Sequence, residues 1–180
     1  MTPLRILIYV TWLVFWIYWL VSAAGAKSGS RPARTRPPGL VIVVLGFLLI
    51  RVSGVRSPEV TSVALQAVGL VVFLSGLALA IWARVYLGSN WGMPMTRKDQ
   101  PELVTSGPYR FVRHPIYSGI LLGLLGTALA TNIYWLMAGA VMGAYFIYSA
   151  RVEEALLTKS FPTAYPSYRA RTKMLIPFVL

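Results

Sequence analysis

Apolar residues occur along this chain in five long runs separated by short polar segments. The runs cover about residues 4–24, 39–52, 60–87, 116–130 and 133–150. A helix that spans a bilayer needs about 20 apolar residues, within a range of about 17–25. Because the runs are too long for the strands of a membrane barrel, the pattern predicts membrane-spanning helices. The runs 39–52 and 116–130 are short for a span, and their length also suits buried or re-entrant segments.

The first run has two features of a secretory signal peptide. Arg5 suits the charged start of such a peptide, and Ala24-Gly25-Ala26 resembles a small-residue cleavage site. The run is longer than a usual signal core, however, and it carries Trp12, Trp16 and Trp19. We therefore expect a spanning helix here.

Charged residues are scarce and lie mainly between the apolar runs. The chain is 57% hydrophobic and 12% charged, whereas a soluble domain averages about a quarter charged residues. The net charge of +12 would suggest nucleic-acid binding in a soluble protein, but here most basic residues abut predicted spans. They concentrate in the loop after the first run, the loop after the third run and the tail, and the positive-inside rule places these segments in the cytoplasm. We expect a multi-pass protein of a bacterial or archaeal plasma membrane, with its N-terminus outside and its C-terminus cytoplasmic.

Two residue counts narrow the chemistry. The chain has no cysteine, which excludes disulfides, thiolate nucleophiles and thiolate metal sites. It has a single histidine, His114, which excludes a metal site built from several histidines. The sequence predicts no metal site and gives no information on the oligomeric state.

One group of polar residues lies between Gly88 and Tyr117, before the fourth run. Gly107-Pro108 marks a turn, and Pro115 suits the first turn of the fourth helix, where its missing N–H costs nothing. Arg113 and His114 then lie at a helix N-terminus, where backbone N–H groups favour an anion. Taken alone, Arg113 is typical of an interfacial anchor and His114 of a structural histidine.

A second group begins at Glu153-Glu154, just after the fifth run. Acids near the hydrocarbon need partners, and Arg151 and Arg169 are near enough in sequence to serve. Small residues let helices pack closely in lipid, and glycines recur in the last two runs at positions 119, 123, 126, 139 and 143. The short loop at Thr131-Asn132 makes the fourth and fifth helices an antiparallel hairpin. Its spacing predicts that Arg113-His114 and Glu153-Glu154 meet at the cytoplasmic end.

Two motifs resemble those of a known family. They are Gly107-Pro108-Tyr109-x-x-x-Arg113-His114-Pro115-x-Tyr117-x-Gly119 and Glu153-Glu154-x-x-Leu157-x-x-x-Phe161-x-x-x-Tyr165-x-x-Tyr168-x-x-Arg171. Both are similar to motifs of the isoprenylcysteine carboxyl methyltransferases and their bacterial and archaeal relatives, as is Gly88-Ser89-Asn90-Trp91 before them. The family often has Arg-x-Pro after the final tyrosine, whereas this chain has Lys173 in the proline position.

The resemblance implies an all-α integral membrane protein of about five transmembrane helices in a single domain, 1–180. Residues 1–87 would form the first three helices, and 88–180 the methyltransferase core. S-adenosylmethionine would bind in a cytoplasmic region formed by the last two helices, the loop before them and the C-terminal tail. The fold implied is not the soluble Rossmann-type methyltransferase, and no glycine-rich dinucleotide fingerprint occurs.

The resemblance also assigns site residues. Those expected to bind the cofactor are Tyr109, Arg113, His114, Pro115, Tyr117, Glu153 and Glu154. Those expected to take part in catalysis are Glu154 and the arginines that can hold an acceptor carboxylate, Arg151, Arg169 and Arg171. A glutamate can pair with the cofactor's ammonium or ribose hydroxyls, Arg113 and the helix N-terminus with its carboxylate, and Tyr109 or Tyr117 with its sulfonium.

The expected reaction is methyl transfer from S-adenosylmethionine to a lipophilic acceptor, foremost the carboxylate of an isoprenylcysteine or similar prenylated lipid. The alternatives are N-methylation of a phospholipid amine, an NADPH-dependent membrane reductase, and a non-enzymatic structural or transport membrane protein. A transporter should show inverted repeats and broken helices at the midplane, and the sequence shows neither. The expected partners are the lipid bilayer and the acceptor, not nucleic acid.

Overall fold

The fold is a bundle of long helices with a small cap of short elements at one end. The computed structural model describes residues 2–23, 29–30, 59–91, 97–98 and 102–177. Its long helices are α1 (Pro3–Ala23), α3 (Val63–Leu87), α4 (Pro115–Ala130) and α5 (Tyr134–Ser160), followed by the short helix α6 (Ala164–Arg171). The predicted span at 39–52 lies outside the described residues.

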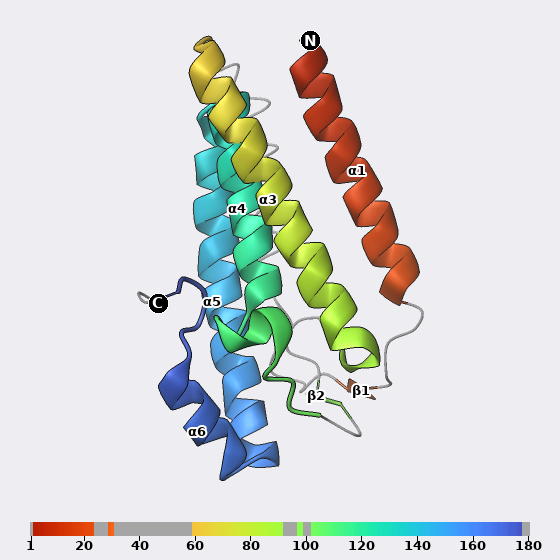
Figure 1. Cartoon of the computed structure of the whole chain (residues 1–180), viewed down its shortest axis with the longest axis vertical. Coiled ribbons are helices and arrows are strands. Elements are labelled where there is room, and N and C mark those ends of the chain that lie inside the picture. Colours follow the sequence, from red (N-terminus) through yellow and green to blue (C-terminus); the bar gives the residue numbers. More distant parts are fainter. Residues whose placement is uncertain (1, 24–28, 31–58, 92–96, 99–101, 178–180) are drawn as a thin grey trace.

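Short elements join the long helices near one end of the bundle. The 3-10 turn η1 (Gly88–Asn90) follows α3, and a second one, η2 (Gly107–Arg110), precedes α4. Two-residue strands β1 (Gly29–Ser30) and β2 (Arg97–Lys98) pair in antiparallel fashion. Figure 1 shows β1, β2 and α6 at the same end of the bundle.

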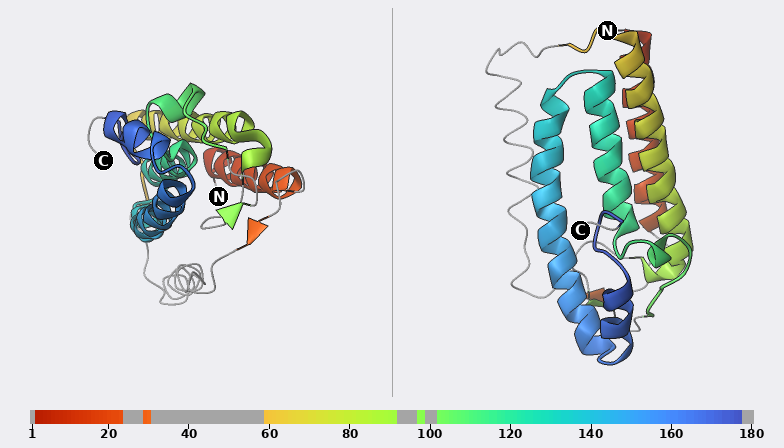
Figure 2. Two further views of the ribbon diagram at one scale, coloured as in Figure 1. Left: turned by 90° about the horizontal axis from the view of Figure 1, so that it is seen from below. Right: turned by 60° about the vertical axis from the view of Figure 1, so that its left-hand side comes forward.

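The helices α4 and α5 form the predicted antiparallel hairpin (Figure 2). In Figure 1, α1, α3 and α5 run in one direction and α4 runs in the other. The predicted fifth run ended at residue 150, but α5 continues as a single helix to Ser160. Glu153 and Glu154 therefore lie on the helix itself, at a fixed rotation relative to its apolar part.

The outward faces of α1 and α3 are apolar. Both helices are long and apolar enough to cross a membrane by length and composition, whereas α4 is a shorter apolar helix. Large apolar side chains point away from the bundle, including Leu20, which is 74% exposed, and Val63, which is 78% exposed. Lipid accepts such faces at no cost, so the bundle suits a bilayer.

Local sequence signals explain where the helices begin and end. Ser62 caps α3, and its side-chain oxygen accepts a hydrogen bond from the backbone N–H of Leu65. Gly88 ends α3 with a φ of 54°, a conformation that glycine adopts without strain. Pro115 begins α4 at a position where its missing N–H leaves no helical bond unmade.

The helices α3 and α4 pack closely through glycines. A Cβ added at Gly69 or Gly76 would lie 2.5 Å from a backbone nitrogen of α4, and one at Gly126 would lie 2.2 Å from Phe73 N of α3. The sequence predicted close packing from the glycines of both the fourth and fifth runs. On α5, however, a Cβ at Gly139 would meet only Leu124 Cβ at 3.9 Å. The close contact is therefore between α4 and α3, not between α4 and α5.

We expect Gly126→Ala to lower the free energy of unfolding by about 1–3 kcal/mol, because the added methyl forces the two helix backbones apart. Thermal unfolding in detergent micelles measures the change. The matched control is Gly139→Ala, whose methyl finds room at ordinary contact distance and should leave the midpoint unchanged or slightly raised. Equal midpoints for the two variants would contradict this assignment of the packing.

At the opposite end of the bundle from α6, the side chain of Arg5 contacts two other segments of the chain. Arg5 of α1 donates to Glu59 Oε1 at 2.7 Å and to the carbonyl oxygen of Thr131 at 3.4 Å. Val60 N also donates to Thr131 O at 3.1 Å. These contacts join the start of α1, the approach to α3 and the turn between α4 and α5, so the hairpin is fixed at its closed end.

Candidate functional site

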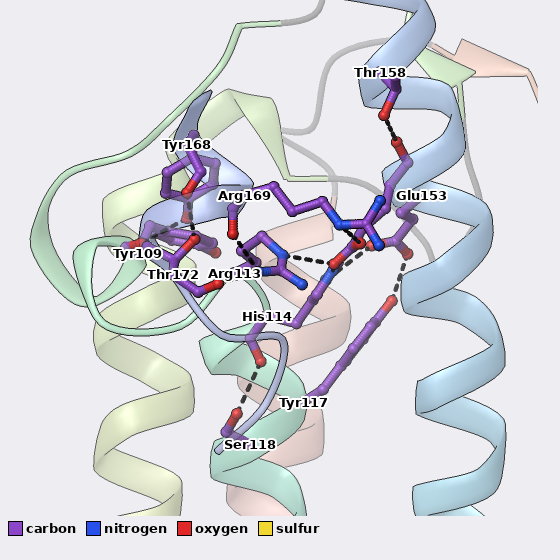
Figure 3. A network of polar contacts seen from close by, with 11 residues as sticks. Tyr109, Arg113, His114, Tyr117, Ser118, Glu153, Thr158, Tyr168, Arg169 and Thr172 are labelled. Atoms are coloured by element: carbon purple, nitrogen blue, oxygen red, sulfur yellow. Dashed lines mark hydrogen bonds and ion pairs between the residues drawn. The ribbon is translucent and has the colours of Figure 1, made fainter. Parts of the chain in front are cut away.

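The two predicted groups of charged residues meet at the open end of the α4–α5 hairpin (Figure 3). Arg113 Nε donates to Glu154 Oε1 at 2.7 Å, and both side chains are more than nine-tenths buried. Arg113 comes from the segment before α4, and Glu154 from the extension of α5. The predicted convergence is therefore confirmed. We call Arg113, His114, Glu153 and Glu154 the charged cluster.

His114 lies between the two glutamates of the cluster. Its Nδ1 is 3.4 Å from Glu153 Oε2, and its Nε2 is 3.4 Å from Glu154 Oε1. The side chain is only 8% exposed. His114 is also the residue that precedes the first turn of α4, so the start of the helix fixes where the imidazole lies.

Tyr117 joins the cluster to the apolar core. Its hydroxyl donates to Glu153 Oε1 at 2.5 Å. Its ring is stacked between those of His114 and Phe146, with centroid distances of 5.4 Å and 4.3 Å and interplanar angles of 5° and 6°. The three rings therefore form a buried stack beside the glutamates.

The segment after α6 folds back and holds the other side of the cluster. Val112 and Lys173 form a parallel bridge, and the backbone N–H groups of Arg113 and His114 donate to Lys173 O at 2.8 Å and Met174 O at 3.0 Å. The side chain of Arg113 donates to the carbonyl oxygens of Arg169 and Thr172. The guanidinium therefore connects α5, α6 and the segment before α4. The backbone N–H groups of Arg113 and His114, which we expected to bind a cofactor carboxylate, therefore donate to the segment after α6 instead.

The charges of the cluster set the protonation of its members. Burial disfavours a charge on His114, but the neighbouring Glu153 and Glu154 outweigh burial and raise its pKa above the ordinary value. Burial likewise disfavours ionised Glu154, but His114 and Arg113 outweigh it and lower the pKa of this carboxyl. Glu154 is thus held as a carboxylate, and His114 is biased toward the imidazolium.

The remaining predicted site residues differ in their distance from the cluster. Arg169 is the arginine of α6 that reaches it, with Nε 3.5 Å from Glu154 Oε2 and a side chain that is 59% exposed. Arg171 is exposed and donates to Ser167 O at 3.2 Å within its own helix. Arg151 is exposed on α5, and within the described part of the chain the structure gives it no contact with the cluster. Pro115 is buried as the first residue of α4.

Tyr109 is buried and its polar groups are committed to the scaffold. Its hydroxyl donates to Ala83 O of α3 at 3.3 Å, and its carbonyl oxygen accepts from Tyr168 Oη at 2.6 Å. Burial raises its pKa, so the hydroxyl keeps its proton. Tyr109 therefore joins α3 to α6 beneath the cluster. Contact between its ring and a sulfonium stays a prediction.

Sequence reasoning missed two residues that border the cluster. Ser149 Oγ and Tyr165 Oη are buried and have no hydrogen-bond partner within the described residues. Ser149 lies one helical turn before Glu153 on α5, and the charge of Glu154 acts on Tyr165 of α6. The spacing of four residues to Glu153 was the only available signal for Ser149, whereas Tyr165 was visible as part of the second motif.

These unpaired atoms indicate what the site can hold. His114 Nε2 makes no hydrogen bond among the described residues, but it already faces Glu154 Oε1 at 3.4 Å. Buried polar atoms normally find partners, so the unpaired hydroxyls of Ser149 and Tyr165 point to a polar ligand.

The sequence profile of the phospholipid methyltransferase family matches residues 64–164, which is more than half of the chain. The matched segment includes α3, α4, α5 and the charged cluster. The match therefore covers the elements that build the site.

Curated relatives extend the comparison. The nickel-cobalt-cadmium resistance protein NccN of Alcaligenes xylosoxydans xylosoxydans is 29% identical over 76% of this chain and 62% of its own length. The protein-S-isoprenylcysteine O-methyltransferase of Xenopus laevis is 29% identical over 64% of this chain and 41% of its own length. Isoprenylcysteine O-methyltransferase B of Arabidopsis thaliana is 30% identical over 62% of this chain and 58% of its own length. The chain thus spans less than two thirds of these relatives.

A solved structure agrees in fold. The eukaryotic intramembrane Ras methyltransferase ICMT (isoprenylcysteine carboxyl methyltransferase) has a TM-score of 0.69 to this chain. The two are 22% identical, and the likeness covers 99% of this chain and 69% of the other. The resemblance expected from the motifs is confirmed by these comparisons: the chain belongs to the phospholipid methyltransferase family and is related to the isoprenylcysteine O-methyltransferases.

Proposed function

We propose that this membrane protein transfers a methyl group from S-adenosylmethionine to the carboxylate of an isoprenylcysteine or a similar prenylated lipid. The observation that carries the proposal is the charged cluster, in which two glutamates face Arg113 and His114 at the end of lipid-exposed helices. Relatives named as isoprenylcysteine O-methyltransferases match 62% and 64% of the chain. The site thus combines groups for a polar donor with access for an apolar acceptor.

The chain's own residues would hold the methyl donor, which supplies an electrophilic methyl group on a sulfonium. Glu153 and Glu154 provide negative charge for its ammonium or hydrogen-bond acceptors for its ribose hydroxyls. Tyr165 Oη is a buried hydroxyl without a partner among the described residues and can contact a polar group of the donor. Arg113 holds Glu154 in place through Nε, and its Nη1 donates to the carbonyl oxygens of Arg169 and Thr172. An anionic group of the donor could therefore use only the remaining N–H groups of this guanidinium.

Arg169 is our choice among the three arginines for the acceptor. It alone of them contacts the charged cluster, and its side chain lies at the exposed rim. An acceptor carboxylate is ionised at neutral pH, so the reaction needs no general base. The protein's task is to hold carboxylate and methyl group in line at about 3–3.5 Å and to keep water out. A guanidinium at the rim can fix the carboxylate by two parallel hydrogen bonds.

N-methylation of a phospholipid amine is a second candidate, which the description of the matching family favours. An ammonium is no nucleophile, so a base must take its proton before transfer. Glu153 can serve, because its side chain is partly exposed and lies at the edge of the cluster. The two candidates therefore differ in whether the chemistry uses a carboxylate of the enzyme or one of the substrate.

The test is an assay of the purified protein with radiolabelled S-adenosylmethionine, offering N-acetyl-S-farnesylcysteine and phosphatidylethanolamine in separate reactions. We expect base-labile label in the farnesylcysteine product, since methyl esters release methanol in base and N-methyl amines do not. We also expect Arg169→Ala to lower kcat/KM for farnesylcysteine by about tenfold or more with unchanged cofactor affinity. The matched control is Arg151→Ala, an exposed arginine away from the cluster. Label in neither lipid would contradict the proposed function, and base-stable label would favour the amine.

A further inference from the structure

The imidazole of His114 lies between the two buried carboxylates that could hold a cationic ligand. Its two nitrogens face oxygens of different glutamates at 3.4 Å each. A neutral imidazole donates from one nitrogen only and would point a lone pair at a carboxylate with the other. A positive charge on the ring is attracted by the carboxylates on both sides, so the place of the ring between Glu153 and Glu154 suits the imidazolium.

The charges around His114 support the same conclusion. The charged and titratable groups that face it or its partners come from the segment before α4, from α4, from α5 and from α6: Arg113, Tyr117, Glu153, Glu154, Tyr165 and Arg169. Arg113 balances one of the two glutamates inside the buried part of the site, and Arg169 lies at the exposed rim. The buried charge is therefore near zero only if His114 is protonated. The raised pKa of His114 agrees with this count.

We propose that His114 holds a proton while the site is empty and releases it to solvent when the ammonium of S-adenosylmethionine takes its place beside Glu153 and Glu154. This inference rests on the proposed function, because it presumes that the site binds this donor. The proton leaves the imidazolium, a neutral imidazole remains, and the incoming ammonium supplies the lost positive charge. Arg113 already lies beside Glu154, so an imidazolium and an ammonium together would leave the buried site with a net positive charge. Binding of the ammonium therefore favours loss of the proton from His114.

Proton release makes cofactor affinity depend on pH in a defined sense. Where His114 is protonated in the free protein, binding releases about one proton, and the affinity rises about tenfold for each unit of pH. The rise ends where His114 is already neutral before binding. The site would thus bind its methyl donor more weakly in an acidified compartment.

The single histidine of the chain allows a direct test. The protein is produced with a tag that contains no histidine, labelled with 15N-histidine and studied in detergent micelles. We expect the ring nitrogens to show the imidazolium pattern in the free protein near pH 7 and the pattern of a neutral tautomer with saturating S-adenosylmethionine. Calorimetry in buffers of different ionisation enthalpy should give release of about one proton. Arg110→Ala, which removes an exposed arginine outside the charged cluster and keeps His114, should release the same number.

The outcomes separate this inference from the proposed function. Binding of S-adenosylmethionine with no change in the ring signals and no buffer dependence would overturn the proton release and leave the donor assignment intact. Proton release with unchanged ring signals would also overturn it, since the proton would come from another group. Failure of the wild-type protein to bind S-adenosylmethionine would overturn the proposed function and this inference with it.

Discussion

Glu154→Ala is expected to lower the affinity for S-adenosylmethionine by about a hundredfold or more and to lower the thermal stability of the free protein. Glu154 is 4% exposed and contacts Arg113, His114 and Arg169. Removing one partner of a buried ion pair costs about 3–5 kcal/mol, because the other charge is left buried and unpaired. Each 1.4 kcal/mol is a factor of ten in binding. Calorimetry gives the affinity, and thermal unfolding gives the stability.

Two variants separate charge from packing. Glu154→Gln keeps the shape of the side chain and one hydrogen-bond acceptor, so we expect a smaller loss of stability but most of the loss of affinity. Glu59→Ala removes a carboxylate that also pairs with an arginine, Arg5, but at the other end of the bundle and with a side chain that is 61% exposed. It should leave affinity unchanged. If Glu154→Ala binds S-adenosylmethionine with wild-type affinity, Glu154 is not part of the site that binds the methyl donor.

Arg113→Ala is expected to release the segment after α6 from the bundle and to lower the free energy of unfolding by about 3–5 kcal/mol. The side chain donates to Glu154 and to the carbonyl oxygens of Arg169 and Thr172. Its loss leaves a buried carboxylate and carbonyl oxygens without donors. Thermal unfolding in micelles and limited proteolysis near Thr172 measure the two effects.

Arg110→Ala is the matched control for this change. Arg110 lies three residues earlier, is exposed, and contacts the ring of Phe111 with its guanidinium 4.5 Å from the ring centre. Its removal should change the midpoint little, as for most surface substitutions. If the protease cleaves Arg113→Ala near Thr172 no faster than it cleaves Arg110→Ala, the prediction is contradicted. The segment after α6 would then be held by its backbone hydrogen bonds alone.

The convergence of the charged cluster could be predicted because it depends on short-range rules. A turn as short as Thr131-Asn132 leaves two helices no arrangement but an antiparallel hairpin. Residues at similar distances from that turn then lie near the same level. Arg113-His114 and Glu153-Glu154 come close to this condition, and Arg113 is found 2.7 Å from Glu154.

Features that depend on distant neighbours could not be predicted in the same way. The glycines of the fourth run predict that another helix packs closely against it, but they do not identify that helix. The structure shows that it is α3, which contributes Gly69 and Gly76 to the contact. The end of α5 at Ser160 could not be located from hydrophobicity, because the apolar run stops near residue 150 and the helix continues with a polar sequence. The pairing of Val112 with Lys173 leaves no pattern in the sequence, since it consists of backbone hydrogen bonds.

The returning tail also determines when the site forms during synthesis. A ribosome makes the chain from its N-terminus, so α1, α3, α4 and α5 are made before residues 172–175. The side chain of Arg113 donates to a carbonyl oxygen 59 positions later in the chain. A nascent chain that had just completed α5 would therefore still lack the partners that fix this arginine, and the charged cluster is complete only after residues 172–175 have been made.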